Sequence, residues 1–510
     1  MTPRTMAAEA AAMPPGSKIR VCGWVTERTA DAVQVADSTG SIAVVPCAEL
    51  DGVRIGDAVE VRATRSATGF VGASACVWPA TAALPEDVTG SDSPYSYLRF
   101  RSGEAVDLLR AADRAVTVAR SHLAEHYFVE ANTPQLWRAT REYGEPELRV
   151  TDSADPESGS WLQQSPTVPA MLCAIGGIDR AFQFSRCFRT ESSASPLKAY
   201  EFTQLNLAVT FTSVEEQFRL LEGLFETVSS ALGLPSWGKA PFPVIDHDAC
   251  IRRFGSDTPD YRYAAFPTPV LDGGPLGRPG QRIRALIVPE CSADIAHALR
   301  SMAERHLGAE AVFRHDSDGA GTLGAVYSGL VPSGPVALVG CADGARAEAF
   351  VRMLAQALYP IVTNEQPPAF GPVWIRRQPF LSDEKQEEHP HHSRCLFGRR
   401  LGPEGELADS YDLVVNGVEL LSGSQNEVDH RQALKNFSDA GVADPQETYG
   451  YYLDALRFGA PPLHNTSIGW ERLMALLLGV PMRDVMIMPK TGSGQCAVTG
   501  LPVKAASGRA

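Results

Sequence analysis

The chain has 510 residues, and its 44 % apolar and 21 % charged content is ordinary for a globular protein with a real core. Its formal net charge of −14 argues against a protein that binds nucleic acid over its whole surface, although this net charge is compatible with a local basic patch. No run of 18 or more apolar residues occurs and the N-terminus lacks the apolar core of a signal peptide, so we expect a cytoplasmic protein without a membrane span. The ten cysteines are scattered without metal-binding spacing, which indicates reduced core thiols.

The N-terminal region is expected to form a small β-barrel. Residues 1–17 are Ala-rich and are expected to be a disordered tail. Five short strand-like runs separated by turn residues then occupy residues 18–82, and this spacing favours a barrel. Residues 83–100 are rich in Pro, Asp and Ser, which is typical of a linker.

The rest of the chain divides into two flanking segments and an insertion. Residues 101–264 show helical periodicity at 104–127, two strand-like runs around a polar loop between 182 and 211, and a helix near 214–232. Residues 265–371 carry their own mixture of helix and strand patterns, and we interpret them as an inserted domain. Strands return in residues 372–500, with a helix at 429–439, and residues 501–510 form a short tail.

Three stretches of this chain are similar to motifs of a known family. They are "YFVEANTPQL", "FSRCFRTE…YEFTQL" and "GWERLMALLLG". In that order they resemble the three signature motifs of class II aminoacyl-tRNA synthetases, and the surrounding sequence resembles the bacterial-type aspartyl-tRNA synthetases from about residue 18 to about residue 504. Several linked motifs in the right order are a strong signal, although each alone would be weak.

The resemblance implies an α+β fold in three parts. These are an N-terminal OB-fold barrel of the anticodon-binding type, an antiparallel catalytic sheet of six to seven strands flanked by helices, and an inserted α/β domain of the bacterial GAD type. It also implies a homodimer formed partly through the first motif, where Pro134 lies.

The implied chemistry is activation of an amino acid by ATP to an aminoacyl adenylate, followed by transfer to a tRNA. A guanidinium can bridge the amino-acid carboxylate and the α-phosphate with forked hydrogen bonds, and Arg189 matches that position. By the same resemblance Glu191 would contact ATP, and Arg472 would hold the γ-phosphate. Asp412 and Glu419 would hold Mg²⁺, which prefers hard oxygen ligands. The residues expected around the α-ammonium are Glu142, Ser165 and Gln204.

The expected side-chain pocket departs from the family. Two cations recognise the aspartate carboxylate there, but the aligned residues here are Ala170 and Asn426. No Lys occurs between Tyr127 and Leu197, so the missing lysine does not depend on the alignment. Further replacements are Thr167 for a glutamine, Asn206 for an aspartate near the ammonium, and Leu463, His464 and Asn465 in the Gly-rich stretch before the third motif. His391 and His392 remain and could contact a side chain.

The barrel also departs from the family at the positions that contact the anticodon. There an exposed Phe stacks on one base and a Gln reads another, whereas Ala32 and Ala43 fall near these positions here. Trp24 aligns with a core position. We therefore expect a barrel that is either a structural remnant or a reader of a different RNA.

Three functions fit this pattern of retained and lost residues. The first is a ligase that activates an amino acid other than aspartate, with tRNA or a small nucleophile as acceptor. The second is a working aspartate–tRNA ligase that holds the side chain with His391, His392 or Arg431. The third is a catalytically silent regulator, against which the retention of the ATP residues counts.

Overall fold

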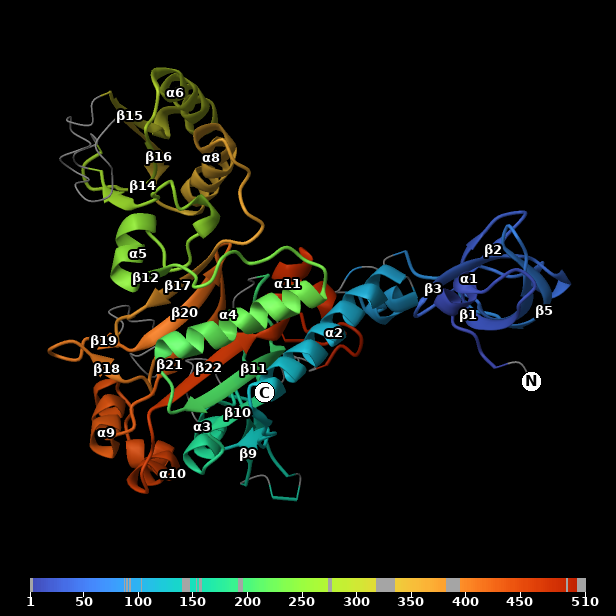
Figure 1. The fold of residues 1–510 in the computed structure, drawn as a ribbon, viewed down its shortest axis with the longest axis horizontal. Coiled ribbons are helices and arrows are strands. Elements are labelled where there is room, and N and C mark those ends of the chain that lie inside the picture. The colour runs from blue at the N-terminus through green and yellow to red at the C-terminus, as the bar shows by residue number, and fades with distance from the viewer. Residues whose placement is uncertain are drawn as a thin grey trace, which may run out of the picture.

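The protein, as a computed structural model, consists of a barrel, a central sheet domain and an upper inserted domain (Figure 1). The structure describes residues 3–86, 88, 90, 93–101, 103–139, 147–152, 154–155, 158–190, 196–273, 278–317, 335–381, 395–491 and 494–501. Within these ranges, no helix has the length and apolar character needed to cross a bilayer. All ten cysteines are free thiols, as expected.

The N-terminal strands form a closed barrel with the order β1-β2-β3-β5-β4, which is the OB-fold that the sequence indicated. Alternate residues such as Val33 and Val35 point inward and are fully buried, so the barrel has a packed apolar interior. Its strands are β1 (Lys18–Arg28), β2 (Val33–Asp37), β3 (Gly40–Val45), β4 (Ala58–Arg65) and β5 (Phe70–Trp78).

The expectation of a disordered tail over residues 1–17 is wrong for residues 7–12, which form a helix. Helix α1 (Ala7–Ala12) packs on the barrel with Ala7 and Ala10 buried. The backbone N–H of Ala7 donates to Asp37 Oδ2 at 2.9 Å, and that of Ala8 donates to Thr39 Oγ1 at 3.1 Å. Small alanine side chains allow this short helix to approach the barrel closely, so the Ala-rich composition marks a packed helix.

Trp24 is not a core residue, contrary to the expectation from its alignment. Its side chain is 36 % exposed on the outside of β1, and the guanidinium of Arg101 lies 5.5 Å from its ring. Arg101 also donates to the carbonyl of Gly56 at 3.2 Å. This cation–π contact joins the barrel to the 3₁₀ helix η2 (Ser96–Arg101), which ends the linker.

The central domain contains an eight-stranded sheet with the order β12-β17-β20-β21-β22-β11-β10-β6. The six inner strands pair antiparallel, as expected, and the edge strands β12 and β6 each add a short parallel pair. The strands are β6 (Val129–Glu130), β10 (Arg180–Phe188), β11 (Glu201–Thr210), β12 (Val244–Asp246), β17 (Pro372–Arg376), β20 (Ser410–Val415), β21 (Val418–Gln425) and β22 (Leu463–Gly469).

The two faces of this sheet differ in chemistry because successive side chains of a strand point to opposite sides. On one face, Leu205, Leu207 and Ile468 belong to a large apolar cluster under α2 (Gly103–Glu125), α4 (Val214–Ala231) and α11 (Trp470–Leu478). These helices cross the front of the sheet in Figure 1. The start of α4 is set by Ser213, whose side chain accepts from the backbone of Glu216 in a capping box.

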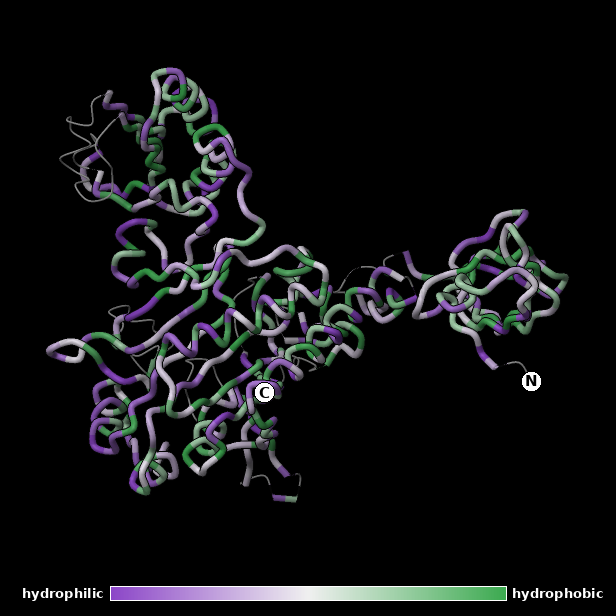
Figure 2. Tube along the Cα trace, viewed as in Figure 1, coloured by the Kyte–Doolittle hydropathy of each residue, from purple (hydrophilic) through white to green (hydrophobic). Residues whose placement is uncertain are grey.

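The opposite face is covered at one end by α3 (Thr167–Ile175), α9 (His430–Asp439) and α10 (Pro445–Arg457), and is polar elsewhere. Figure 2 shows hydrophobic residues along the barrel, the sheet and the helices, and hydrophilic residues in many of the loops. The smaller elements are β7 (Leu136–Trp137), β8 (Arg149–Val150), β9 (Ser160–Leu162), β18 (Arg400–Leu401), β19 (Leu407–Ala408), η1 (Ala48–Leu50), η3 (Tyr261–Tyr263) and η6 (Met482–Val485).

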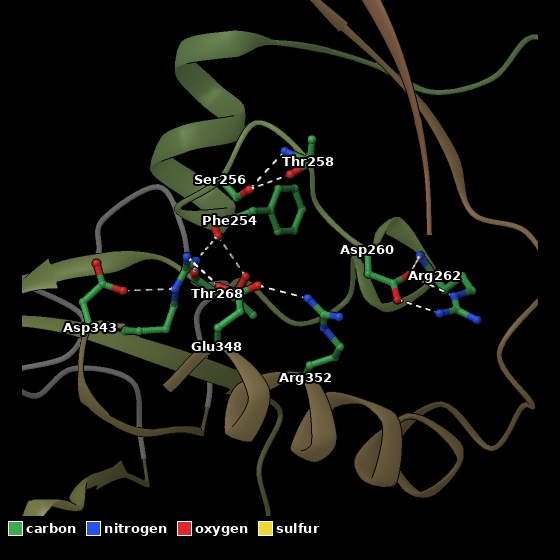
Figure 3. A network of polar contacts seen from close by, with 10 residues as sticks. Phe254, Ser256, Thr258, Asp260, Arg262, Thr268, Asp343, Glu348 and Arg352 are labelled. Atoms are coloured by element: carbon green, nitrogen blue, oxygen red, sulfur yellow. Dashed lines mark hydrogen bonds and ion pairs between the residues drawn. The ribbon is translucent and has the colours of Figure 1, made fainter. Parts of the chain in front are cut away.

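The inserted domain mixes helices and strands around an antiparallel sheet with the order β13-β14-β16-β15. One buried side chain joins it to the central domain. Arg284 on β14 donates to the carbonyls of Phe254 and Thr268 at 2.7 and 3.1 Å and pairs with Glu348 at 2.8 Å (Figure 3). The elements of the inserted domain are β13 (Val270–Asp272), β14 (Arg282–Pro289), α6 (Ala293–Leu307), η5 (Gly308–Glu310), β15 (Val312–Asp316), β16 (Val336–Ala342) and α8 (Ala345–Thr363), and α5 (His247–Phe254) precedes them in the central domain.

Candidate active site

The polar face of the central sheet forms the floor of the candidate site. One cross-strand row runs over five neighbouring strands, because the register pairs its members one after another. The row consists of Gln183, Asn206, Ser467, Ser422 and Asp412. A polar row across the middle of a sheet is unusual for a packed core, and it indicates a surface that receives a ligand.

Arg189 lies at the end of β10, where the sheet gives way to a loop. Its backbone N–H continues the ladder to the carbonyl of Tyr200 at 3.0 Å. Its side-chain Nε donates to the carbonyl of Gln164 at 3.2 Å, and the guanidinium lies 5.1 Å from the ring of Phe202. These contacts hold the guanidinium beside the stretch that begins α3, so Arg189 is pre-oriented next to the residues expected to bind the amino acid.

Arg472 lies in the first turn of α11 and reaches two backbone carbonyls. Nη1 donates to Glu419 at 2.6 Å, and Nη2 donates to Leu197 at 3.2 Å. The neighbouring Glu471 accepts from the backbone N–H of Thr203 at 2.8 and 3.0 Å, and burial raises its pKa. These residues connect α11 to strands β11 and β21 of the sheet.

Asp412 and Glu419 lie on the adjacent strands β20 and β21. Burial, and next the negative charge of Glu419, raise the pKa of Asp412. Asp412 Oδ2 accepts from Gln378, whereas Oδ1 is buried and has no partner among the described residues. An unsatisfied acceptor beside a second carboxylate fits a hard divalent cation such as Mg²⁺. Mg²⁺ is commonly bound through one or two carboxylates together with water and substrate phosphates, and these two carboxylates fit that pattern.

Three of the residues expected around the α-amino group are held by short polar contacts. The hydroxyls of Ser165 and Thr167 lie 2.6 Å apart at the start of α3. Asn206 Nδ2 donates to Ser467 Oγ at 3.0 Å, and its buried Oδ1 has no partner among the described residues. Gln204 is also buried on this face and accepts from the thiol of Cys187 at 3.3 Å.

The two positions that have lost a cation are both buried. Ala170 is buried in an apolar cluster that includes Phe397 and Leu463. Asn426 is 1 % exposed, its backbone N–H donates to the carbonyl of Leu463 at 2.7 Å, and its Nδ2 lies 3.4 Å from the carbonyl of Phe397. Asn426 thus contacts two members of the apolar cluster to which Ala170 belongs, and both replaced positions are neutral.

Several residues that complete this region were absent from the expected site. Asn465, which was noted only as a departure from the family, accepts at Oδ1 from Asn426 Nδ2 at 2.8 Å and from Ser424 Oγ at 3.2 Å. Ser467 and Gln378 contact Asn206 and Asp412, as described above. The signal was present in "LHNTSIG", where strand alternation places Asn465, Ser467 and Gly469 on one face.

Four expected site residues lie outside the described ranges, namely Glu142, Glu191, His391 and His392. Arg431, considered as a replacement cation, is exposed in the first turn of α9. Its backbone N–H donates to the cap residue Asp429 at 3.0 Å. Among the described residues, Arg472 contacts the backbone of Glu419, the charge of Glu419 acts on Asp412, and Arg189 contacts the backbone of Gln164 before α3.

Comparison with known proteins is consistent with this geometry. The family model for class II tRNA synthetases (D, K and N) matches residues 91–492. The chain is 30 % identical over 468 residues to an aspartate–tRNA(Asp/Asn) ligase of Acidothermus cellulolyticus, covering 82 % of this chain and 77 % of the relative. It is 29 % identical over 439 residues to an aspartate–tRNA(Asp) ligase of Deinococcus radiodurans, covering 78 % and 74 %.

Solved structures share the fold. The asparaginyl-tRNA synthetase of Pyrococcus horikoshii, complexed with asparaginyl-adenylate, has a TM-score of 0.62 at 18 % identity and covers 96 % of this chain and 99 % of its own. That of Entamoeba histolytica, also with asparaginyl-adenylate, has a TM-score of 0.60 at 14 % identity, with 96 % and 98 % covered. With motifs, site geometry, sequence relatives and fold in agreement, the chain belongs to the family of class II tRNA synthetases of the D, K and N type.

Proposed function

We propose that this protein activates an amino acid other than aspartate with ATP, forming an aminoacyl adenylate and pyrophosphate. The observation that carries the proposal is a contrast within one site. Arg189, Arg472, Asp412 and Glu419, which we assign to the ATP side, are present, and backbone carbonyls hold both arginines. On the proposed side-chain side, the two positions expected to carry cations are the buried, neutral residues Ala170 and Asn426.

In the proposed reaction the amino-acid carboxylate attacks the α-phosphorus of ATP, and the bond to pyrophosphate breaks. Two anions must approach each other, so a fixed cation at their meeting point lowers the barrier electrostatically. Arg189 would supply that cation, and Arg472 would bind the outer phosphate. Asp412 and Glu419 would hold Mg²⁺, which when bound neutralises phosphate charge.

The neutral pocket is the reason to exclude aspartate as the preferred substrate. Burying a carboxylate without a partner costs several kcal/mol, and the two positions that would provide one are Ala170 and Asn426. A site that recognises by polar pairing discriminates by orders of magnitude, so the loss of both cations should remove the preference.

The acceptor of the activated amino acid is proposed to be a tRNA or a small nucleophile. The barrel carries Ala32 and Ala43 near the two positions where the family reads the anticodon, and Ala43 is exposed on β3. Without an aromatic there, base stacking worth roughly 1–3 kcal/mol is missing, which favours a different or weaker RNA contact.

A homodimer is also proposed. Tyr127 and Phe211 are 86 % and 75 % exposed, and both lie at the end of the sheet where Arg180 begins β10. The side chain of Arg180 donates to the carbonyl of His126. The backbone N–H of Thr210 donates to the carbonyl of Asp179, the residue before Arg180. Tyr127 precedes the first motif, where Pro134 lies, and we therefore place the proposed interface at this end of the sheet.

The second candidate is an aspartate–tRNA ligase, which the identity to the ligases of Acidothermus and Deinococcus favours. It would need a cation from elsewhere, and the exposed Arg431 is the residue considered for that role.

The test is amino-acid-dependent exchange of pyrophosphate into ATP, without tRNA, over the standard amino acids and analogues of aspartate and asparagine. Exchange with an amino acid other than aspartate supports the proposal. Exchange with aspartate alone establishes the second candidate. No exchange with any amino acid, from protein that is folded by circular dichroism, overturns both and favours a silent regulator. Arg189→Ala serves as the inactive control.

A further inference from the structure

We infer that the side-chain pocket selects a neutral side chain carrying both a hydrogen-bond donor and an acceptor, such as a carboxamide, through the interlocked pair Asn426 and Asn465. This inference rests on the proposed amino-acid activation and names the substrate class of the same pocket. It follows from which atoms of the two amides are occupied and which are left for a ligand.

The orientation of the Asn426 amide is set by its surroundings. One end lies 3.4 Å from the carbonyl of Phe397, and a carbonyl oxygen can only accept a hydrogen bond, so that end must be Nδ2. The same Nδ2 donates to Asn465 Oδ1 at 2.8 Å. Both protons of Nδ2 are therefore used inside the protein.

This arrangement leaves Oδ1 as the group that Asn426 can offer. The atom is buried, and it has no hydrogen-bond partner among the residues that the structure describes. The backbone of Asn426 is fixed, because its N–H donates to the carbonyl of Leu463 at 2.7 Å and a β-bridge joins Asn426 to Gly398. A buried acceptor held in this way requires a donor from outside.

Asn465 provides the complementary group. Its Oδ1 accepts from both Asn426 and Ser424, so the remaining polar atom is Nδ2. No hydrogen bond from this Nδ2 is found within the described part of the chain, and the residue is half-buried on the polar face of β22. One amide thus presents an acceptor and the other a donor.

A carboxamide satisfies both groups, since its NH₂ can donate to Asn426 Oδ1 and its carbonyl can accept from Asn465 Nδ2. A carboxylate would place an oxygen against Asn426 Oδ1, where two acceptors repel each other. The adjoining cation, Arg399, is paired with Asp409 at 2.5 Å. A purely apolar side chain would leave Asn426 Oδ1 unsatisfied.

The experiment measures pyrophosphate exchange by the full-length protein with asparagine, aspartate and leucine, which have similar size and differ in polarity. We expect asparagine to exceed both of the others by roughly 100-fold or more in kcat/KM, as polar pockets discriminate. The variant Asn426→Leu should lose at least about 10-fold of this preference while the KM for ATP stays unchanged. The matched control is Gln432→Leu on α9, which removes an amide that contacts only Asn436 among the described residues.

Each result decides the inference separately from the proposed function. If leucine or another apolar amino acid is the best substrate, activation stands and the inference is overturned. If aspartate is the best, both fail. If Asn426→Leu is poorly folded, Asn426→Arg replaces it, and this variant should gain activity with aspartate relative to asparagine. An unchanged ratio in folded Asn426→Arg contradicts the role of Asn426.

Discussion

Arg472 donates a hydrogen bond of 2.6 Å from Nη1 to the backbone carbonyl of Glu419. The cation at the start of α11 is therefore attached to the strand that carries one of the two proposed Mg²⁺ ligands. Although these residues are 53 positions apart in the sequence, they are in contact, so a substitution of either one should disturb the same part of the proposed nucleotide site.

The first prediction concerns this attachment. Arg472→Lys keeps the charge but loses the planar fork that reaches Glu419 and Leu197 together. Since hydrogen bonds to charged groups contribute about 1.5–3 kcal/mol, we expect kcat/KM for ATP to fall roughly 10- to 100-fold. Pyrophosphate exchange measures the effect, with Arg457→Lys on α10, an exposed arginine, as control. Equal activity of the two variants would contradict the role of Arg472.

The second prediction concerns Glu471 and pH. Burial raises the pKa of Glu471 above its ordinary value of 4.5, so the folded state holds its proton to a higher pH than the unfolded chain does. In that window the native state binds more protons, and stability therefore decreases as the pH rises. Glu471→Gln should remove this decrease, because a neutral amide oxygen can still accept from Thr203. We expect a smaller pH dependence of the unfolding free energy above pH 4.5.

Urea denaturation between pH 5 and pH 8 provides the measurement for Glu471→Gln. The matched control is Glu310→Gln, which removes an exposed carboxylate paired with Arg346 in the inserted domain. Exposed pairs contribute about 0–1 kcal/mol, so the control should retain the pH dependence of the wild type. If Glu471→Gln retains it as well, the burial of Glu471 does not govern stability in this range.

The third prediction concerns the connection to the inserted domain. Arg284 is 9 % exposed and binds the carbonyls of Phe254 and Thr268 as well as Glu348. Arg284→Met should destabilise the protein by about 2–4 kcal/mol, because it leaves buried groups unpaired. Arg352→Met removes an exposed pair with Glu348 at 3.4 Å and should cost less than about 1 kcal/mol.

Hydrogen exchange locates the effect of Arg284→Met. Amides of β14 and of the end of α5 should exchange faster, while those of β11 in the central sheet should remain as in the wild type. A uniform change over the whole chain would show that Arg284 stabilises the protein generally and does not connect two domains in particular.

The fourth prediction concerns association. Phe211→Glu places a charge on a side chain that is 75 % exposed at the proposed dimer interface. We expect dissociation to monomers, observed by analytical ultracentrifugation at micromolar concentration. Trp78→Glu is the control, because Trp78 is 54 % exposed on the distant barrel (Figure 1). A dimer that survives Phe211→Glu would place the interface elsewhere.

The strands of the barrel were predictable from the sequence because alternation and turn residues are local signals. The antiparallel catalytic sheet followed from the family resemblance, and the structure pairs β11 with β22 in it. These features depend on patterns that a single chain displays directly.

Other features depend on contacts that local patterns do not contain. Trp24 lies outside the barrel core, where its ring contacts Arg101 of η2, a residue far along the chain from β1. The contact between Asn426 and Asn465 requires the register that pairs Ser424 with Asn465. Register is set by the whole sheet, so the sequence showed that Asn426 and Asn465 replace family residues without showing that their side chains are in contact.

The two-faced sheet has a consequence for the history of this protein. Neighbouring residues of β22 serve separate purposes, since Thr466 and Ile468 point away from Asn465 and Ser467. Mutations in every second codon can therefore alter what the pocket accepts, while the intervening codons preserve the packing beneath the helices. Such a scaffold allows a duplicated gene to acquire a new substrate through viable intermediates, and laboratory selection could vary the same alternate codons.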